Sequence, residues 1–421
     1  MAQRLIVGLD LGSSRIRLAV GQISTASEHG PSLSVVGAVE APSQGIAKGV
    51  GSALEDAVSS LSGALEAAER QVGVPIEEAI VGIGGLHFTV MSAKGVVGVS
   101  RADGEIRSED VDRVLESAKA AANPANHEIL HVLPHGFTVD GQTGIKDPVG
   151  MHGIRLEAEA HLVMGLAGNV RNTTRMVFRT GLDIAELVFG PLAAAEAVTN
   201  SRERELGVCV VSLGSSTTSL VILEEGELLH AVVLPIGADH ITSDIAIGLR
   251  TSLAVAEAVK LQHGTAVPDD LGKHDEIDLI EYGAEQNELV SLKYVAEIIE
   301  ARSEEIFEKI EQELRRVDRS GLLPAGVMLT GGGAKLPGLT DVAKRCLRLP
   351  ACVGAATHLA TPMPEYVHDP AFSTAGGLVQ WGYDDLRGGL GRGGGGRLSG
   401  SGKALGKLGG QLKKVFKSFI P

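Results

Sequence analysis

The sequence contains an internal repeat, and this duplication constrains the fold more than any other feature. The tetrapeptide Leu-Gly-Ser-Ser at residues 11–14 recurs at residues 213–216. The match extends outward, because residues 6–10 correspond to 208–212 and residues 18–20 correspond to 220–222. Each copy predicts a strand, a tight polar turn and a second strand. Two copies therefore predict two lobes of duplicated topology.

The two polar turns have the composition of phosphate-binding loops. Glycine lets the backbone turn closely, and hydroxyl and backbone N–H groups can meet phosphate oxygens. Either copy alone would more often be a plain hairpin turn. A matched pair, one opening each half of the chain, favours a phosphate clamp between two lobes. The runs 5–11 and 208–213 are continuously apolar and predict central strands covered on both faces.

A third glycine-rich element, residues 328–338, follows a short apolar strand and precedes a predicted helix over residues 339–347. Its consecutive glycines leave space for a flat ring against the backbone. A triple glycine is weak evidence by itself, and it gains weight only from its place after the two polar turns.

The charge of the chain is divided sharply between an acidic body and a basic tail. The 421 residues carry a net charge of −14, which argues against nucleic acid as a partner. From Leu386 to Pro421 there are eight Lys or Arg and no acidic residue, whereas the preceding residues carry 30 basic and 52 acidic side chains.

The cysteines and the N-terminus indicate a cytoplasmic protein. Cys209, Cys346 and Cys352 have neither metal-ligand spacing nor the number that a disulfide framework needs, which fits a reducing compartment. Residues 4–10 form only a short apolar run before an acid, so we expect neither a signal peptide nor a membrane span there.

The basic tail divides into a predicted flexible linker and a predicted amphipathic helix. Residues 387–402 are mostly Gly, Ser and Arg, which is typical of a flexible coil. Over residues 403–421 the apolar side chains fall within an arc of about 140°, and lysines occupy the other side. The apolar set is Leu405, Leu408, Leu412, Val415, Phe416, Phe419 and Ile420, and the basic set is Lys407, Lys413, Lys414 and Lys417. A core helix of the second lobe would need neither the linker nor a purely basic polar face, so we predict binding to anionic membrane lipid.

One such tail binds a membrane weakly. Its half-buried apolar side chains supply roughly 7 kcal/mol, and each lysine adds up to about 1 kcal/mol near anionic lipid. Ordering about fifteen residues costs about as much as the apolar side chains supply. Several tails on one polymer would bind tightly by avidity, which predicts self-assembly.

The order of these parts resembles the actin-like ATPase superfamily, in which two phosphate loops precede an adenosine-binding glycine motif. Within it the sequence is most similar to the FtsA family of bacterial cell-division proteins, over nearly the whole chain. The segments that carry the resemblance are residues 43–46 with 48–49, 100–106, 128–134, 145–151, 244–249 and 369–372.

The resemblance implies the α/β, actin-like (ribonuclease H-like) duplicated two-lobe fold, with a nucleotide in the cleft and an FtsA-type subdomain inserted in the first lobe. We therefore expect the first lobe at residues 1–85 and 164–202 and the inserted subdomain at 86–163. The second lobe is expected at 203–386, with a helical subdomain at about 243–324. The linker at 387–402 and the membrane helix at 403–421 follow.

The resemblance also implies ATP and Mg²⁺ as cofactors and assigns residues to them. In the first phosphate loop Asp10 would contact Mg²⁺ through water, and Arg15 stands where the family usually has lysine. Glu257 and Lys260 match residues that touch the ribose and base, although without the resemblance they would be an exposed intrahelical ion pair. The full nucleotide set is Asp10, Gly12, Ser13, Ser14, Arg15, Gly214, Ser215, Ser216, Thr217, Thr218, Glu257, Lys260, Gly331, Gly332, Gly333 and Lys335.

The second phosphate loop departs from the family pattern. Ser212 stands where the loop usually has its acid, and Ser219 replaces another frequent acid of the strand. Actin-like hydrolysis relies on carboxylates in both loops to hold hydrated Mg²⁺ and orient water. Since only Asp10 remains, we expect ATP to be hydrolysed slowly or hardly at all and to act as a conformational clamp.

Residues 127–131 match the HExxH pattern of zinc proteases, but we interpret them as a strand. The pattern binds zinc only on a helix, which places both imidazoles on one face. Pro124 and Pro134 flank the segment, and it continues in an extended rhythm.

Residues 286–316 predict one long helix, with its basic residues Lys293 and Arg302 exposed. The resemblance places the docking site for the acidic C-terminal peptide of FtsZ, the tubulin-like division protein, on this subdomain. A basic face suits an acidic peptide, so Arg302 and, more weakly, Lys293 are the expected contacts. Without the resemblance both would be a solvated surface. The apolar positions are Leu289, Leu292, Val295, Ile298, Ile299, Ile306, Ile310 and Leu314.

The resemblance implies a peripheral protein that polymerises on the cytoplasmic face of the inner membrane at the division site and tethers FtsZ filaments, with other divisome proteins as partners. A sugar kinase or chaperone of the superfamily would explain only the loops, because no catalytic base stands out and no substrate domain follows residue 386. A pilus-assembly relative or another soluble actin-like ATPase is the alternative, and the amphipathic tail disfavours it.

Overall fold

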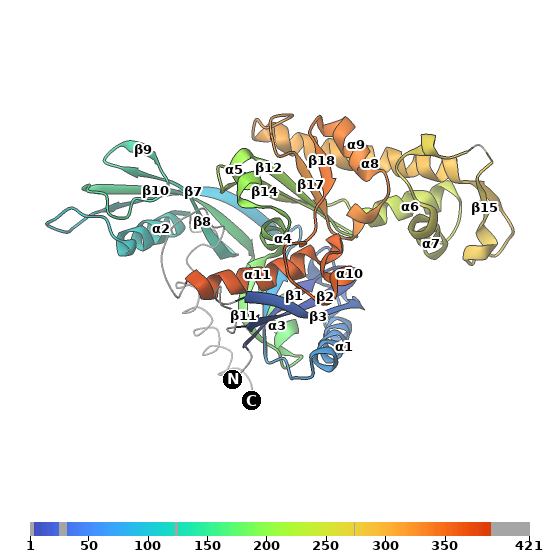
Figure 1. Ribbon diagram of the computed structural model, residues 1–421, viewed down its shortest axis with the longest axis horizontal. Coiled ribbons are helices and arrows are strands. Elements are labelled where there is room, and N and C mark those ends of the chain that lie inside the picture. The colour runs from blue at the N-terminus through green and yellow to red at the C-terminus, as the bar shows by residue number, and fades with distance from the viewer. Residues whose placement is uncertain (1–3, 25–31, 123–124, 273, 389–421) are drawn as a thin grey trace.

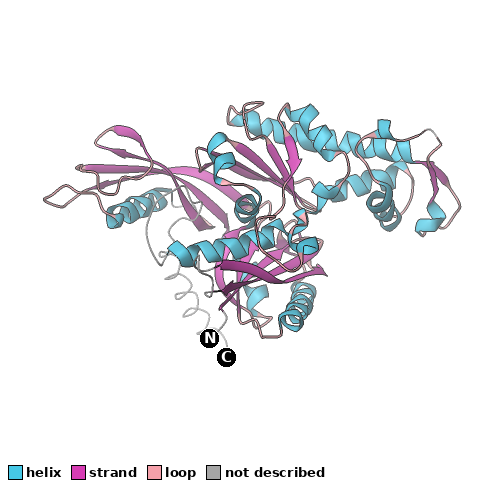
Figure 2. Cartoon of the chain, viewed as in Figure 1, coloured by secondary structure: helices cyan, strands magenta, loops and turns pink. Residues whose placement is uncertain are grey.

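Two five-stranded sheets form the centres of two lobes, and both sheets have the same topology (Figures 1 and 2). The computed structural model describes residues 4–24, 32–122, 125–272 and 274–388. The strand orders are β11-β6-β1-β2-β3 and β14-β13-β12-β17-β18. The first-lobe strands are β1 (Arg4–Leu11), β2 (Arg15–Ser24), β3 (Ser32–Pro42), β6 (Glu78–Ile83) and β11 (Asp183–Phe189). The second-lobe strands are β12 (Val208–Leu213), β13 (Thr218–Glu224), β14 (Glu227–Leu234), β17 (Val327–Thr330) and β18 (Ala351–Val353).

The predicted duplication is confirmed in the strand register. In each lobe three strands form an antiparallel meander, and two further strands add in parallel. Asp10 pairs with Arg17 across β1 and β2, and Ser212 pairs with Ser219 across β12 and β13. The predicted central strands β1 and β12 are mostly buried, as their continuous apolar runs require.

The last helix belongs to the first lobe, which corrects the assignment of all residues 203–386 to the second. Helix α11 (Ser373–Gly388) packs on α4 (Gly190–Val198) and β1, where a Cβ on Gly377 would lie 1.9 Å from the Ala193 carbonyl oxygen. Its apolar residues Leu378, Val379 and Trp381 complete the first-lobe core. The helix ends at Gly388, two residues beyond the expected boundary. The remaining first-lobe elements are β4 (Ile46–Ala47), β5 (Val50–Gly51), α1 (Leu54–Val72), α3 (Ala167–Phe178), α10 (Pro364–Val367) and the 3₁₀ helix η4 (Pro370–Phe372).

A four-stranded sheet and one helix form a subdomain that projects from the first lobe, to the left in Figure 1. The order is β7-β10-β8-β9, all antiparallel. Helix α2 packs on β7 and β10, where Gly95 lets the helix backbone approach closely. The elements are β7 (Phe88–Gly98), α2 (Ser108–Ala122), β8 (His127–Val139), β9 (Gln142–Ile145) and β10 (Arg155–Leu166).

The helical part of the second lobe lies at the opposite end of the molecule (Figure 1). Its long helix α8 (Leu292–Arg316) begins six residues later than expected, because Leu289–Ser291 pairs as strand β16 with β15 (Glu276–Asp278). The other elements of the lobe are α5 (Ser201–Leu206), α6 (Ala238–Gly248), α7 (Leu253–His263), α9 (Leu339–Leu347) and the 3₁₀ helices η1 (Pro268–Asp270), η2 (Leu279–Tyr282) and η3 (Gly332–Lys335). Within the described part of the chain, none of the helices has the length and hydropathy needed to cross a membrane.

Candidate functional site

The two repeated turns face each other across a cleft between the lobes. The cleft is lined by both turns, by Gly331 and Gly332, and by the first-lobe residues Gly84 and Pro191. The turns need glycine, because a Cβ on Gly12 would lie 2.4 Å from the Arg15 carbonyl oxygen. Most of the predicted phosphate-loop residues therefore lie at one site.

A direct hydrogen bond joins the two turns. The Ser216 hydroxyl donates to the Ser13 hydroxyl over 2.9 Å, although the residues are 203 positions apart in the chain. The second turn is closed by a hydrogen bond from Gly214 N–H to the Thr217 carbonyl. Thr218, by contrast, is fully buried, and its hydroxyl donates to the Ile236 carbonyl. Thr218 therefore supports the turn and does not line the cleft.

Arg17 is a cleft residue that the sequence reasoning missed. Its side chain is 14% exposed, whereas that of Arg15 is 47% exposed, and both pair with Glu40 at the rim. The Arg17 guanidinium lies over the Phe372 ring, 5.8 Å from its centroid. The sequence did contain a signal for Arg17. In a hairpin with a tight turn at residues 12–14, the residue seven positions after Asp10 lies opposite it on the neighbouring strand. Arg17 is better placed than Arg15 to serve as the buried cation of the first loop.

Asp10 is a partly buried carboxylate that lines the cleft and pairs in register with that cation. Burial raises the pKa of Asp10 to about 6, and the charge of Arg17 opposes the rise. Ser212 and Ser219 also line the cleft but offer only hydroxyls. Magnesium prefers several anionic or carbonyl oxygens. Among the described residues no three His, Cys, Asp or Glu side chains are grouped to hold a metal, so the donor set of this cleft does not fit a metal held by the protein itself.

The third glycine element is tied to the segment that leads into α11. Gly331 has a φ of 83°, and its N–H donates to the Pro370 carbonyl over 3.0 Å. The Thr330 hydroxyl donates to Ser373 over 2.7 Å. Lys335 pairs with Asp369 at 2.6 Å. The segment 369–372, singled out in the sequence, thus anchors this loop to the first lobe.

Two members of the predicted adenosine motif lie outside the cleft lining. A Cβ on Gly333 would meet the Leu213 side chain at 2.5 Å, so this glycine serves helix-to-strand packing. Lys335 is a half-exposed ion-pair residue.

Glu257 and Lys260 form an ion pair at 2.6 Å, but the pair is not the exposed one that spacing alone suggested. Lys260 is only 8% exposed, and its ammonium donates to the Thr242 hydroxyl over 2.7 Å. Thr242 in turn donates to Glu257 over 2.5 Å. Neither charged residue is among those that line the cleft, so their contact with a nucleotide stays a prediction.

Arg302 has partners that the sequence did not reveal. Its guanidinium donates to both carboxylate oxygens of Asp244, at 2.5 and 2.9 Å, and also pairs with Glu305. These residues line a shallow hollow with Ile247 and Ile298. Lys293 lies 3.6 Å from Asp269. The surface around Arg302 is therefore a neutralised ion network and not the basic face that was expected.

The HExxH segment is a strand, as predicted, since β8 spans His127–Val139. His131 is buried, and its Nε2 accepts the backbone N–H of Phe189 at 2.9 Å. Its ring lies 5.4 Å from that of Trp381. Burial lowers the pKa of His131 to about 4. This histidine is therefore a neutral packing residue that joins the inserted subdomain to β11 and α11.

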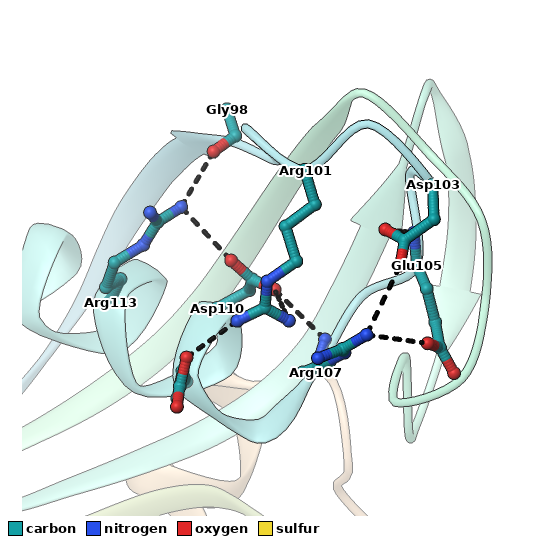
Figure 3. A network of polar contacts seen from close by, with 8 residues as sticks. Gly98, Arg101, Asp103, Glu105, Arg107, Asp110 and Arg113 are labelled. Carbon is teal, nitrogen blue, oxygen red and sulfur yellow. Dashed lines mark hydrogen bonds and ion pairs between the residues drawn. The ribbon is translucent and has the colours of Figure 1, made fainter.

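The segment 100–106 has a structural role in the inserted subdomain (Figure 3). Asp110, at the start of α2, is 3% exposed and lies 3.2 Å from Arg113 and 3.7 Å from Arg101. Its carboxylate also accepts the backbone N–H of Arg107 over 3.0 Å. Arg101 pairs in addition with Glu109 at 2.6 Å. The network fixes the loop before α2, far from the cleft.

The predicted linker from residue 389 onward and the membrane helix at 403–421 lie outside the described residues.

Comparison with known proteins gives a consistent result. The family model "Cell division protein FtsA" matches residues 209–377, and the model "SHS2 domain inserted in FTSA" matches residues 85–164. The cell division protein FtsA of Bacillus subtilis is 37% identical over 90% of this chain and 83% of its own length. That of Pseudomonas aeruginosa is 35% identical over 90% of this chain and 89% of its own length.

Solved structures agree on the fold. The PilM-PilN type IV pilus biogenesis complex matches with a TM-score of 0.64 and 17% identity, over 90% of this chain and 98% of the matched chain. MreB5 of Spiroplasma citri bound to ADP matches with a TM-score of 0.54 and 13% identity, over 93% and 99%. The fold is thus actin-like, and from its sequence relatives the chain belongs to the FtsA family of cell-division proteins.

Proposed function

We propose that this protein binds ATP between its lobes as a conformational clamp, polymerises, and tethers FtsZ filaments to the cytoplasmic face of the inner membrane through its C-terminal helix. The observation that carries the nucleotide part is the pair of equivalent turns that meet through Ser13 and Ser216. Triphosphate oxygens bound between these turns would contact both lobes at once. ATP occupancy would then favour one relative position of the lobes.

The clamp is proposed to work with little hydrolysis. Arg15, Arg17 and the N–H groups of both turns can bind phosphate, but Asp10 is the only carboxylate that lines the cleft within the described residues. Mg²⁺ would arrive with the nucleotide phosphates, and Asp10 could reach it through water. With hydroxyls at Ser212 and Ser219, the second turn lacks a group that could orient an attacking water as a base. A turnover number typical of a metabolic kinase would contradict this part.

The membrane part rests on the composition of the tail. It is tested by co-sedimentation with anionic lipid vesicles, comparing the intact chain with a truncation after Gly388, which keeps α11 whole. A second variant, Phe416→Glu with Phe419→Glu, charges the apolar face. Its matched control, Ser399→Glu with Ser401→Glu, adds the same charge to the linker.

We expect the intact chain and the linker variant to pellet, more strongly with ATP, and the other two variants to stay in solution. If all four proteins pellet equally, or none does, the tail is not the anchor and a soluble actin-like ATPase becomes the better assignment.

The FtsZ part is proposed for the surface at Arg302. Charge reversal by Arg302→Glu should weaken binding of a labelled FtsZ C-terminal peptide about tenfold, because a cation is lost and two carboxylates are left without their partner. Arg345 is the matched control: it also pairs with two carboxylates, Glu300 and Glu304, but lies on α9. Equal peptide affinity of the Arg302→Glu variant and wild type, measured by fluorescence anisotropy, would exclude this surface.

A further inference from the structure

The charges of the cleft come from one lobe only. Among the residues that line it, Asp10, Arg15 and Arg17 are charged, and all three belong to the first lobe. Every second-lobe residue in the lining is glycine, serine or threonine. A phosphate group that enters the cleft therefore meets two cations and the Asp10 carboxylate on one side and neutral donors on the other.

The duplicated register shows which charges the second lobe lacks. Asp10 pairs with Arg17 in the first lobe, and Ser212 pairs with Ser219 at the equivalent positions of the second. A carboxylate accepts hydrogen bonds only, so it repels phosphate unless a cation lies between them. A serine hydroxyl can donate to phosphate directly. The second lobe thus needs no metal ion to face a triphosphate.

Arg17 is held in place to supply positive charge. Glu40 lies 2.8 Å from its Nε and Nη2 atoms, and the Phe372 ring lies beneath the guanidinium. A guanidinium has five N–H donors, so this contact leaves others for a ligand. Gly332, which also lines the cleft, lies on the Nη2 side, because a Cβ there would be 3.8 Å from that atom. Arginine stays charged at any physiological pH.

We propose that this cleft binds the triphosphate of ATP with little dependence on Mg²⁺. The inference rests on the proposed nucleotide clamp and concerns the ionic form of its ligand. A divalent ion commonly neutralises phosphate charge and links it to carboxylates of the site. Here Arg17 and Arg15 supply positive charge, and among the described second-lobe residues that line the cleft there is no carboxylate. The metal ion can accompany ATP but adds little affinity.

The test is the dissociation constant of a fluorescent ATP analogue for the full-length protein, measured with excess Mg²⁺ and with excess EDTA at equal ionic strength. We expect the two constants to differ by less than about threefold. Binding that is more than about tenfold weaker in EDTA overturns the inference while leaving the clamp intact. Absence of binding in both buffers overturns the proposed nucleotide function and this inference with it.

Variants test the physical cause. Ser212→Asp, or Ser219→Asp if the first does not fold, adds a carboxylate and should weaken binding about tenfold in EDTA but much less with Mg²⁺. Arg17→Gln should weaken binding about tenfold in EDTA and clearly less with Mg²⁺, because the metal ion then supplies the positive charge that the arginine supplied. Arg70→Gln, a 72% exposed residue on α1, is the matched control and should change neither constant. If the aspartate variants show the Mg²⁺ dependence of wild type, the missing carboxylates are not the reason.

Discussion

Three histidines in or next to the inserted subdomain are buried or partly buried, which favours their neutral form. Burial lowers the pKa of His87, His131 and His161 to about 4. In an unfolded chain their pKa is near 6.5. Between these values the unfolded chain binds more protons, so the stability contributed by each histidine falls as the pH drops from about 6.5 to about 4. Glu186 has the opposite effect on the pH dependence of stability, because burial and the charge of Asp385 raise its pKa to about 7. Its contribution to stability rises as the pH falls through this value.

The replacement His131→Gln tests this at a single residue. Glutamine can accept the Phe189 N–H but does not titrate. We expect the free energy of unfolding of wild type to fall by about 2 kcal/mol more than that of the variant between pH 7 and pH 5. Urea unfolding at both pH values measures the difference. His152→Gln, at an exposed position, is the control, and an equal pH dependence of His131→Gln and wild type would contradict the prediction.

The inserted subdomain is an element that connects the two lobes. In the sequence it is inserted between the first-lobe elements β6 and α3. It nevertheless also contacts strand β14 of the second lobe. The Lys146 ammonium donates to the Glu225 carbonyl over 2.9 Å. His135 lies 3.3 Å from the Glu227 carboxylate. A change in the angle between the lobes must therefore strain or break these contacts.

Removing the Lys146 side chain should loosen the contact between the inserted subdomain and the second lobe. In Lys146→Ala we expect faster hydrogen–deuterium exchange in residues 224–234, because the turn after β13 loses its partner, with little change in overall stability. Lys94→Ala is the matched control, since Lys94 pairs with Glu159 inside the same inserted sheet. Unchanged exchange in the Lys146→Ala variant would show that the contact does not restrain the lobes.

At the scale of the whole molecule, helix α11 connects the proposed nucleotide cleft to the segment that we propose binds the membrane. The third glycine loop is tied to residues 369–373, and α11 then runs along the first lobe to Gly388. The basic tail therefore leaves from the first lobe and not from the second. Since we expect one tail to bind weakly and several to bind tightly by avidity, membrane attachment should depend on the polymer.

Avidity predicts a cooperative response of membrane binding to protein concentration. With ATP present, the fraction of protein that sediments with anionic vesicles should rise sigmoidally with protein concentration, because bound polymers carry several tails. A variant that lacks residues after Gly388 gives the background. A sedimented fraction that stays constant as the protein concentration rises, with lipid in excess, would mean that single chains bind independently and that assembly is not needed.

Local patterns in the sequence were sufficient for the duplicated framework. The repeated turns, the apolar runs before them and the proline-flanked strand at residues 127–139 depend on neighbours along the chain, so residue order alone determined them. The same holds for the amphipathic pattern of the tail, whereas the loss of a carboxylate at Ser212 and Ser219 is visible only by comparison with the family pattern.

Contacts between distant segments required the tertiary structure. Register across the predicted turn could have placed Arg17 beside Asp10, but only packing shows that Arg17 is mostly buried and Arg15 exposed. The partner of Arg302 is 58 positions away, and burial of Lys260 depends on α6. Helix α11 follows the second lobe in the sequence and was therefore assigned to it, but its apolar face packs on the first lobe. Side-chain partners and lobe membership are decided by packing energy between segments that the sequence does not place side by side.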